Sequence, residues 1–326
     1  MSSMVRTDRL TKEFATGFWR SRRHLALDGL TWEIPAGGVF GLLGPNGAGK
    51  STTLKLLLDL LRPTSGHAEV LGRPAGSVDA RQRLGYLPEN PTFYDQLSAE
   101  ELLIYFAGLF GYRGSDRRAR ATRLLDRVGL GADRRRPLRQ YSKGMVQRVG
   151  LAQALVNDPE LVILDEPMSG LDPVGRHEVR DIILELRDEG RTVLFISHVL
   201  SDAELLCSGV AILSRGRLVK AGAISELTAG KSRGWELVLT GVTEALAARL
   251  AHVATRVTRI ADDRYSAMLS GETRPEPIIA EAAAAGGALV SIAPLRTTLE
   301  DVFLEALAAP VANDGRHPSL QSEGRA

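Results

Sequence analysis

The chain has 326 residues, of which 44% are hydrophobic and 25% are charged, a composition typical of globular proteins. Its 41 basic and 39 acidic residues leave a net charge of +2, so the overall charge does not favour a nucleic-acid partner. No uncharged apolar run is long enough to span a bilayer, and the N-terminus lacks the apolar core of a signal peptide. The length favours two domains, and the single cysteine, Cys207, fits a reducing compartment.

The N-terminal part of the chain is predicted to be rich in strands. Residues 4–14 carry apolar side chains among charged ones, which predicts an edge strand, and residues 25–34 alternate in the same way. The segment between these strands is expected to be an exposed hairpin insertion. An apolar run at 39–43 and leucines at helical spacing over 53–61 then predict a strand and a helix on either side of a glycine-rich turn.

This turn, residues 44–52, matches the phosphate-loop pattern G-x-x-x-x-G-K-S/T. Its glycines let backbone N–H groups point inward at anionic oxygens, and the following helix adds the positive end of its dipole. Lys50 is expected to face the terminal phosphates, and Ser51 to offer its hydroxyl to Mg²⁺. The predicted phosphate-binding residues are Gly44, Pro45, Asn46, Gly47, Ala48, Gly49, Lys50, Ser51 and Thr52.

Residues 90–158 are predicted to form a helical insertion. Apolar side chains recur there at helical spacing in three stretches, 102–110, 121–128 and 146–156. The continuous apolar run at 161–164 then predicts a strand buried on both faces. Strands and helices alternate beyond it, which predicts a mostly parallel sheet with crossover helices.

After residue 230 the pattern restarts in the order strand, helix, strand, strand, helix, strand, which favours a small split-βαβ domain. We therefore expect an α/β domain over 4–230, a small α+β domain over 232–309 that ends in a helix from Thr298, and a disordered tail over 310–326. Because the phosphate loop lies in the first domain, deletion of residues 232–326 is expected to leave a folded domain that still binds ATP.

Two carboxylates follow the buried strand at 161–164. A carboxylate at the end of a strand beside a phosphate loop can hold Mg²⁺ through water, which suits Asp165. Glu166 can polarise an attacking water molecule. Without the phosphate loop, both residues would be read as an ordinary acidic turn.

Two further sites are less specific when taken alone. Ser142 and Gly144 stand at the start of a helix, where backbone N–H groups form an anion site, although an ordinary helix cap is the better explanation of them when they are taken alone. His198 follows a strand at 192–196, where it can reach a γ-phosphate. A lone histidine at a strand end is more often structural.

Together and in this order, the motifs resemble the ATP-binding cassette of ABC transporters over roughly residues 4–230. The resemblance implies a P-loop NTPase cassette with a mostly parallel sheet, antiparallel N-terminal strands and a helical insertion. It implies ATP and Mg²⁺ as cofactors, with 44–52 as the Walker A loop and 161–166 as the Walker B strand.

The resemblance also implies roles for single residues. Phe14 matches the aromatic residue that stacks on adenine, with Phe18 and Trp19 as rivals because the insertion blurs the local alignment. The other implied roles are hydrolysis for Lys50, Glu166 and His198, the signature acting in trans for Ser142, Lys143 and Gly144, the D-loop for Asp172, and Mg²⁺ ligation for Ser51, Asp165 and Glu89.

The sequence departs from the family pattern at two of these motifs. The signature reads Tyr-Ser-Lys-Gly-Met in place of Leu-Ser-Gly-Gly-Gln, but it keeps the key serine and the second glycine. Glu89 stands where the family usually has the glutamine of the Q-loop. A carboxylate oxygen could still ligate Mg²⁺ there, while it adds a negative charge.

The variant signature, the loop at Pro88 and Glu89, and residues 298–304 look like the ATPases of bacterial drug, antibiotic, lipid and polysaccharide exporters. Their permease is usually a separate chain. This resemblance implies an ATP hydrolase that works as a homodimer of cassettes with a membrane permease. It implies a cytoplasmic protein, peripheral on the inner face of the cell membrane, with no nucleic-acid partner.

Two other functions remain open on the sequence. The chain could be a soluble ABC ATPase acting on ribosomes or DNA, but a single cassette, one cysteine and the lack of a long heptad run disfavour this. It could also be a regulatory module that binds ATP without turnover. The presence of Glu166 disfavours that alternative.

Overall fold

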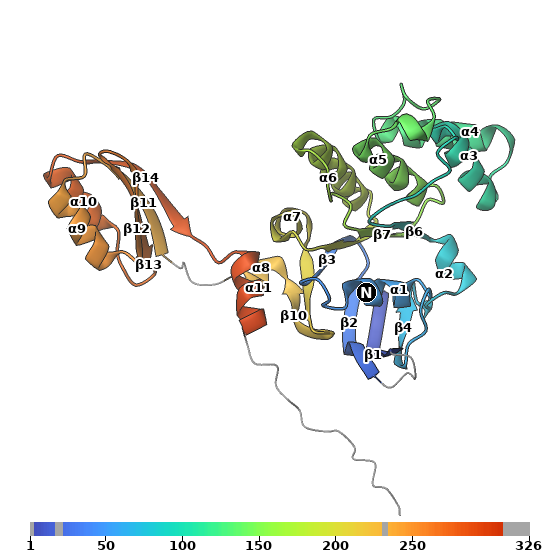
Figure 1. The fold of residues 1–326 in the computed structure, drawn as a ribbon, viewed down its shortest axis with the longest axis horizontal. Coiled ribbons are helices and arrows are strands. Elements are labelled where there is room, and N and C mark those ends of the chain that lie inside the picture. The colour runs from blue at the N-terminus through green and yellow to red at the C-terminus, as the bar shows by residue number, and fades with distance from the viewer. Residues whose placement is uncertain (1–2, 17–21, 230–233, 309–326) are drawn as a thin grey trace, which may run out of the picture.

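The computed structural model describes residues 3–16, 22–229 and 234–308, arranged around three β-sheets (Figure 1). Phe18 and Trp19, the link at 230–233 and the expected tail over 310–326 lie outside the described residues. No helix in the described ranges has both the length and the apolar character that crossing a membrane requires.

The central sheet has six strands in the order β10-β9-β3-β8-β7-β6. Its strands are β3 (Gly38–Leu43), β6 (Leu84–Leu87), β7 (Leu161–Asp165), β8 (Thr192–Ser197), β9 (Gly209–Ser214) and β10 (Arg217–Ala223). All neighbours pair in parallel except β9 and β10, so the predicted mostly parallel sheet is confirmed. The short strand β6 was not predicted, because its four residues are too few to show a clear alternation.

A second, antiparallel sheet carries the N-terminal strands in the order β2-β1-β4-β5. Its strands are β1 (Ser3–Thr16), β2 (Arg22–Pro35), β4 (Ser65–Val70) and β5 (Arg73–Pro74). The prediction that residues 4–14 form an edge strand is wrong, since β1 lies between β2 and β4. Its second partner, β4, lies about 50 residues further along the chain, and the alternation of residues within β1 does not reveal a partner so distant in sequence.

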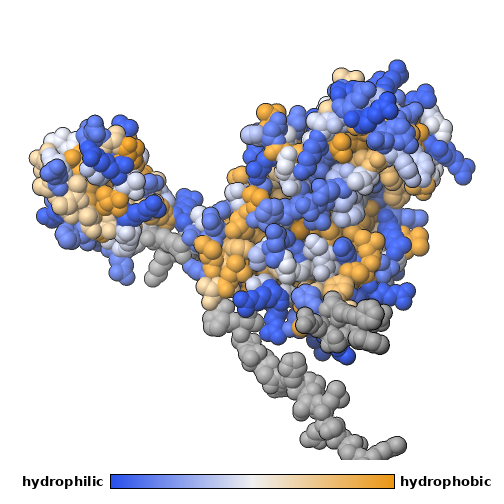
Figure 2. Space-filling view, in the orientation of Figure 1, coloured by the Kyte–Doolittle hydropathy of each residue, from blue (hydrophilic) through white to orange (hydrophobic). Residues whose placement is uncertain are grey.

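Helices flank the central sheet and form the insertion. Those that flank the sheet are α1 (Lys50–Leu57), α2 (Val78–Gln82), α6 (Pro173–Asp188), α7 (Leu200–Leu206) and α8 (Ile224–Leu227), and those of the insertion are α3 (Ala99–Leu109), α4 (Gly114–Arg127), the 3₁₀ helix η1 (Leu138–Gln140) and α5 (Lys143–Ala154). Helix α5 begins earlier than its apolar stripe predicts, because the Ser142 hydroxyl caps it by accepting from the Met145 N–H at 3.2 Å. Figure 2 shows mostly hydrophilic residues on the visible face of the insertion.

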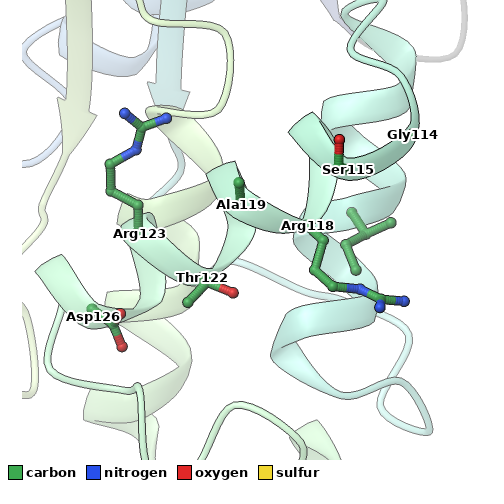
Figure 3. Close-up of a pocket in the computed structure, with 8 residues that line it drawn as sticks. Gly114, Ser115, Arg118, Ala119, Thr122, Arg123 and Asp126 are labelled. Atoms are coloured by element: carbon green, nitrogen blue, oxygen red, sulfur yellow. The ribbon is translucent and has the colours of Figure 1, made fainter.

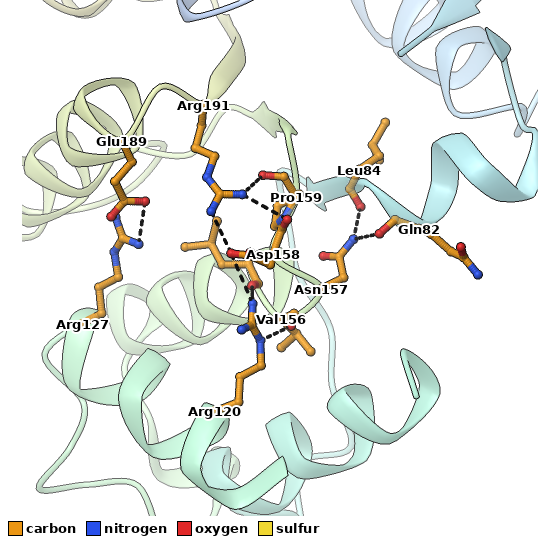
Figure 4. Close-up of polar contacts among 11 residues, drawn as sticks. Gln82, Leu84, Arg120, Arg127, Val156, Asn157, Asp158, Pro159, Glu189 and Arg191 are labelled. Carbon is orange, nitrogen blue, oxygen red and sulfur yellow. Dashed lines mark hydrogen bonds and ion pairs between the residues drawn. The ribbon is translucent and has the colours of Figure 1, made fainter. Parts of the chain in front are cut away.

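Arginines tie the insertion to the central sheet (Figure 4). Arg120 of α4 donates to the backbone oxygens of Val156 and Leu155, and its guanidinium lies 3.6 Å from the Asp158 carboxylate. Arg191 donates to the same carboxylate at 2.8 Å. These bonds fix α4 to the segment that leads into β7, the strand that ends at Asp165 and is followed by Glu166.

The C-terminal sheet has the order β12-β13-β11-β14, with every pair antiparallel. Its elements are β11 (Gly234–Thr240), α9 (Glu244–Val253), β12 (Arg256–Ala261), β13 (Arg264–Ser270), α10 (Glu276–Ala284) and β14 (Ala288–Leu295). Leu237 and Leu239 of β11 pack with Leu246 and Leu250 of α9 in a core of their own. This is the small α+β domain that the order of elements predicts.

The last helix, α11 (Leu299–Ala308), packs on the cassette instead of on this sheet (Figure 1). It contacts α7, α8, β9 and β10, and its Leu299 and Val302 side chains are 0% and 1% exposed within the cassette core. Thr298 and Asp301 cap it in a reciprocal pair of hydrogen bonds. The packing therefore divides the expected unit 232–309, and deletion of residues 232–326 would open the cassette core.

Replacing Leu299 with Ala is expected to lower the free energy of unfolding by about 2–5 kcal/mol, because the change leaves a cavity in the cassette core. Leu304→Ala makes the same chemical change on the same helix, at a side chain that is 57% exposed, and should cost less than about 0.5 kcal/mol. Urea unfolding of both variants measures the difference. Equal losses would show that α11 is not part of that core.

Candidate active site

The phosphate loop runs from the end of β3 into the first turn of α1. Gly49 has a φ of +106°, and a Cβ at this position would lie 2.8 Å from the Ala26 backbone oxygen of β2. Only glycine fits so close to a neighbouring strand in this conformation. The loop is therefore held against the N-terminal sheet at the residue that precedes α1.

Lys50 is folded back into this loop and is only 8% exposed. Its Nζ donates to the backbone oxygens of Gly44 at 2.6 Å and Pro45 at 3.2 Å. Burial lowers the pKa of the ammonium, while the nearby carboxylates of Glu166, Asp165 and Glu89 oppose this shift. A phosphate oxygen is a stronger, charged acceptor than a carbonyl, so the ammonium is placed to bind one.

Asp165 ends β7 in a region of unbalanced negative charge. Burial raises its pKa to about 6, with further contributions from the carboxylates of Glu166 and Glu89, whereas Lys50 opposes the shift. A divalent cation would offset this charge, and the Ser51 hydroxyl and Asp165 carboxylate are oxygen ligands that Mg²⁺ accepts. The described part of the chain contains no group of three or more His, Cys, Asp or Glu that could hold a metal ion by itself.

Glu166 lies in an unusual backbone conformation directly after β7. Its φ is +48°, a left-handed value that costs a non-glycine residue of order 1–3 kcal/mol and that often occurs at functional sites. Its N–H donates to the Ile196 oxygen of β8 at 2.9 Å, which keeps the residue at the sheet edge. The side chain is 11% exposed, so the carboxylate is largely withdrawn from bulk solvent.

The end of β8 supplies two partners for this carboxylate. The Ser197 hydroxyl donates to Glu166 Oε2 at 3.3 Å, and His198 Nδ1 lies 2.7 Å from Glu166 Oε1. Sequence reasoning predicted Glu166 and His198 as separate site residues but missed their direct contact. It also missed Ser197, which is 3% exposed and whose only sequence signal is its place at the end of an apolar strand.

Among the residues predicted to form the signature and the D-loop, Ser142, Lys143 and Asp172 are exposed and Gly144 is half-buried. Ser142 caps α5, and Asp172 caps α6 by accepting from the Gly175 N–H at 2.7 Å. The ammonium of Lys143 lies so close to Gly170 that a Cβ there would collide with it. Within the described ranges, no hydrogen bond or ion pair joins these residues to residues 44–52.

Phe14 lies on β1 with its Cα opposite His24 of β2, on the sheet that borders the phosphate loop. The Lys12 ammonium lies 5.2 Å from the centre of its ring, within range of a cation–π contact. Glu89 follows β6, the neighbour of β7, and is exposed. The competing aromatic residues Phe18 and Trp19 fall outside the described ranges.

Comparison with known proteins agrees with this arrangement. The ABC transporter family matches residues 27–169. An uncharacterized ABC transporter ATP-binding protein from Synechocystis sp. is 43% identical over 94% of this chain and 85% of its own length. The fluoroquinolones export ATP-binding protein of Mycobacterium tuberculosis is 41% identical over 64% of this chain and 68% of its own length.

A solved structure has the same cassette fold. It is the dimeric post-hydrolysis state of an ATP-binding cassette bound to ADP and Pi, with a TM-score of 0.61 and 25% identity over 68% of this chain and 98% of that chain. The fold, the match to the family and the near full-length relative lead to one conclusion. The chain belongs to the ATP-binding proteins of ABC transporters, a family of ATP hydrolases.

Proposed function

We propose that this chain is the ATP-hydrolysing subunit of an ABC exporter and powers a separately encoded membrane permease. The observation that carries the proposal is the Glu166 carboxylate, which is buried beside Lys50 and Asp165 and held from β8 by Ser197 and His198. Such a carboxylate can act as a general base toward a water molecule at the γ-phosphate. The similar protein named for fluoroquinolone export supports the direction of transport.

In this proposal, each side chain acts where its chemistry fits. Lys50 binds the terminal phosphates, and Ser51 and Asp165 would hold Mg²⁺, which neutralises charge on the phosphates when bound. Glu166 accepts the proton of the attacking water. His198 donates from Nδ1 to Glu166 and so presents the opposite side of its ring to the nucleotide.

Two copies of the chain would complete each ATP site. Ser142 and Lys143 are exposed and so available to a second copy, and we assign them, with Gly144, to the γ-phosphate bound by that copy. The dimer of a similar cassette with ADP and Pi supports this arrangement. Closure on ATP would then bring both signature patches onto the two phosphate loops.

The permease would contact the helical insertion. Tyr105 and Leu109 on α3 are 56% and 64% exposed, and Phe110 directly after them is 39% exposed, which is unusual for large apolar side chains so close together. Beside them, a hollow of about 810 Å³ lies along α4 (Figure 3). Arg118 and Arg123 line it and could bind acidic or backbone oxygen atoms of a partner.

Phosphate release from ATP by the purified chain, with and without Mg²⁺, tests the enzymatic part of this proposal. We expect turnover that depends on Mg²⁺. ATP binding without phosphate release would instead support a regulatory binding module.

Glu89→Gln should keep its ATPase rate within about threefold of the wild type, a change in barrier below about 1 kcal/mol. Glutamine restores the usual family residue and keeps an oxygen ligand at this position. Glu89→Ala removes that oxygen and should be slower than Glu89→Gln. Steady-state ATPase assays compare the three proteins, and a folded but inactive Glu89→Gln would give Glu89 a role outside this proposal.

A further inference from the structure

The hydroxyl of Ser197 lies between the catalytic carboxylate and the start of α7. It donates to Glu166 Oε2 at 3.3 Å and accepts from the Val199 N–H at 3.0 Å. A serine hydroxyl has one hydrogen and two lone pairs. Because the Val199 N–H occupies one lone pair from a fixed direction, the single hydrogen is turned toward the carboxylate.

The burial of Ser197 limits the other hydrogen-bond partners that its hydroxyl could have. The residue is 3% exposed at the end of a strand that is buried along its whole length. A buried hydroxyl without a partner is costly, so the carboxylate and the N–H each satisfy it. Glu166 is held in turn at a left-handed φ, where the carboxylate needs partners to keep one orientation.

We propose that Ser197 is a positioning residue for ATP hydrolysis, which fixes the orientation of Glu166 toward the attacking water. This inference rests on the proposed role of Glu166 as the general base. His198 holds one oxygen of the carboxylate from the exposed side, and Ser197 holds the other from the buried side. With both oxygens bound, the carboxylate cannot rotate about its terminal bond.

The position also links Glu166 to α11. The N–H that orients the Ser197 hydroxyl belongs to the cap residue of α7, and α7 packs against α11. On the other side, the Asp202 carboxylate of α7 binds Arg176 of α6 at 2.6 Å. Helix α7 is thus fixed from two sides. The N–H of its cap residue orients the Ser197 hydroxyl, and this hydroxyl in turn orients the Glu166 carboxylate.

Ser197→Thr and Ser197→Val form a matched pair for the test, because threonine and valine have the same shape and differ in the hydroxyl. Ser197→Val should lower kcat for ATP hydrolysis by about tenfold or more, as expected for loss of a hydrogen bond to a charged group. The KM for ATP should change by less than about twofold, since Glu166 acts on water and not on the nucleotide. Ser197→Thr should retain most of the wild-type kcat.

Each outcome decides between specific alternatives. Equal kcat values for the threonine and valine variants, with melting temperatures like the wild type, would overturn the role of Ser197. A rise in KM equal to the fall in kcat would also overturn it, since it would indicate distortion of the ATP site. If Glu166→Gln retains wild-type turnover, the general-base assignment fails instead, which distinguishes the two proposals.

Discussion

Glu166→Gln is expected to lower the rate of ATP hydrolysis by at least about a hundredfold, the usual contribution of a general base. The amide keeps the size of the side chain and can still bind Ser197 and His198, but it cannot accept a proton from water. Lys50, Ser51 and Asp165 are unchanged, so Mg²⁺·ATP binding should persist. Phosphate release and equilibrium nucleotide binding measure the two effects separately.

The trapped ATP should also hold two copies of Glu166→Gln together. Size-exclusion chromatography with light scattering should find a dimer with ATP and a monomer with ADP, unless the C-terminal domain dimerises by itself. Adding Ser142→Arg should abolish the ATP-dependent dimer, because the longer side chain clashes with the γ-phosphate bound by the other copy. A mutant that stays monomeric with bound ATP would contradict the assembly of the site from two copies.

Glu204→Gln supplies the control for this experiment. It makes the same chemical change at an exposed position on α7. This variant should hydrolyse ATP at the wild-type rate and should form no trapped dimer. Wild-type turnover in Glu166→Gln itself would remove Glu166 from the mechanism.

Lys50→Ala is expected to abolish measurable hydrolysis and to weaken ATP binding about tenfold or more, because a charge-assisted hydrogen bond to phosphate contributes roughly 1.5–3 kcal/mol. The change also removes a cation that lies inside the phosphate loop, close to Asp165 and Glu166. ATPase assays and titration calorimetry measure both effects.

Lys55→Ala is the matched control, since Lys55 lies on the same helix and is exposed. Its charge also acts on Asp165, so the control separates general attraction from binding inside the loop. We expect its rate to stay within about twofold of the wild type. Wild-type turnover in Lys50→Ala would contradict the assignment of the phosphate loop.

The parts of the site that could be predicted from sequence are those carried by consecutive residues. The loop at 44–52 and the pair Asp165 and Glu166 each form a short motif whose residue types indicate its function. Parallel pairing of β3, β8 and β7 then places both motifs at the same edge of the sheet. The contact between Glu166 and His198 spans 32 residues, and its geometry depends on the left-handed turn at Glu166. A single sequence does not encode that turn in a recognisable pattern.

The errors in the predicted fold have the same physical origin. The central place of β1 depends on β4, which comes back to it after the phosphate loop and α1. The apolar stripe of α11 predicts that one face of the helix is buried, but it does not predict which part of the protein that face packs against. Ser197 was missed because a serine that ends an apolar strand has no distinguishing neighbours in sequence.

Because α11 returns to the cassette, the small α+β domain (the guest) is an insertion between two parts of the cassette (the host). The chain leaves the host after α8 and re-enters it at Leu299, so both junctions lie on the same side of one core. A single proteolytic cut at either junction would leave two fragments that stay associated through α11. The same topology marks the segment between α8 and α11 as a graft position, where a foreign domain with closely spaced termini could replace the guest without altering the ATP site.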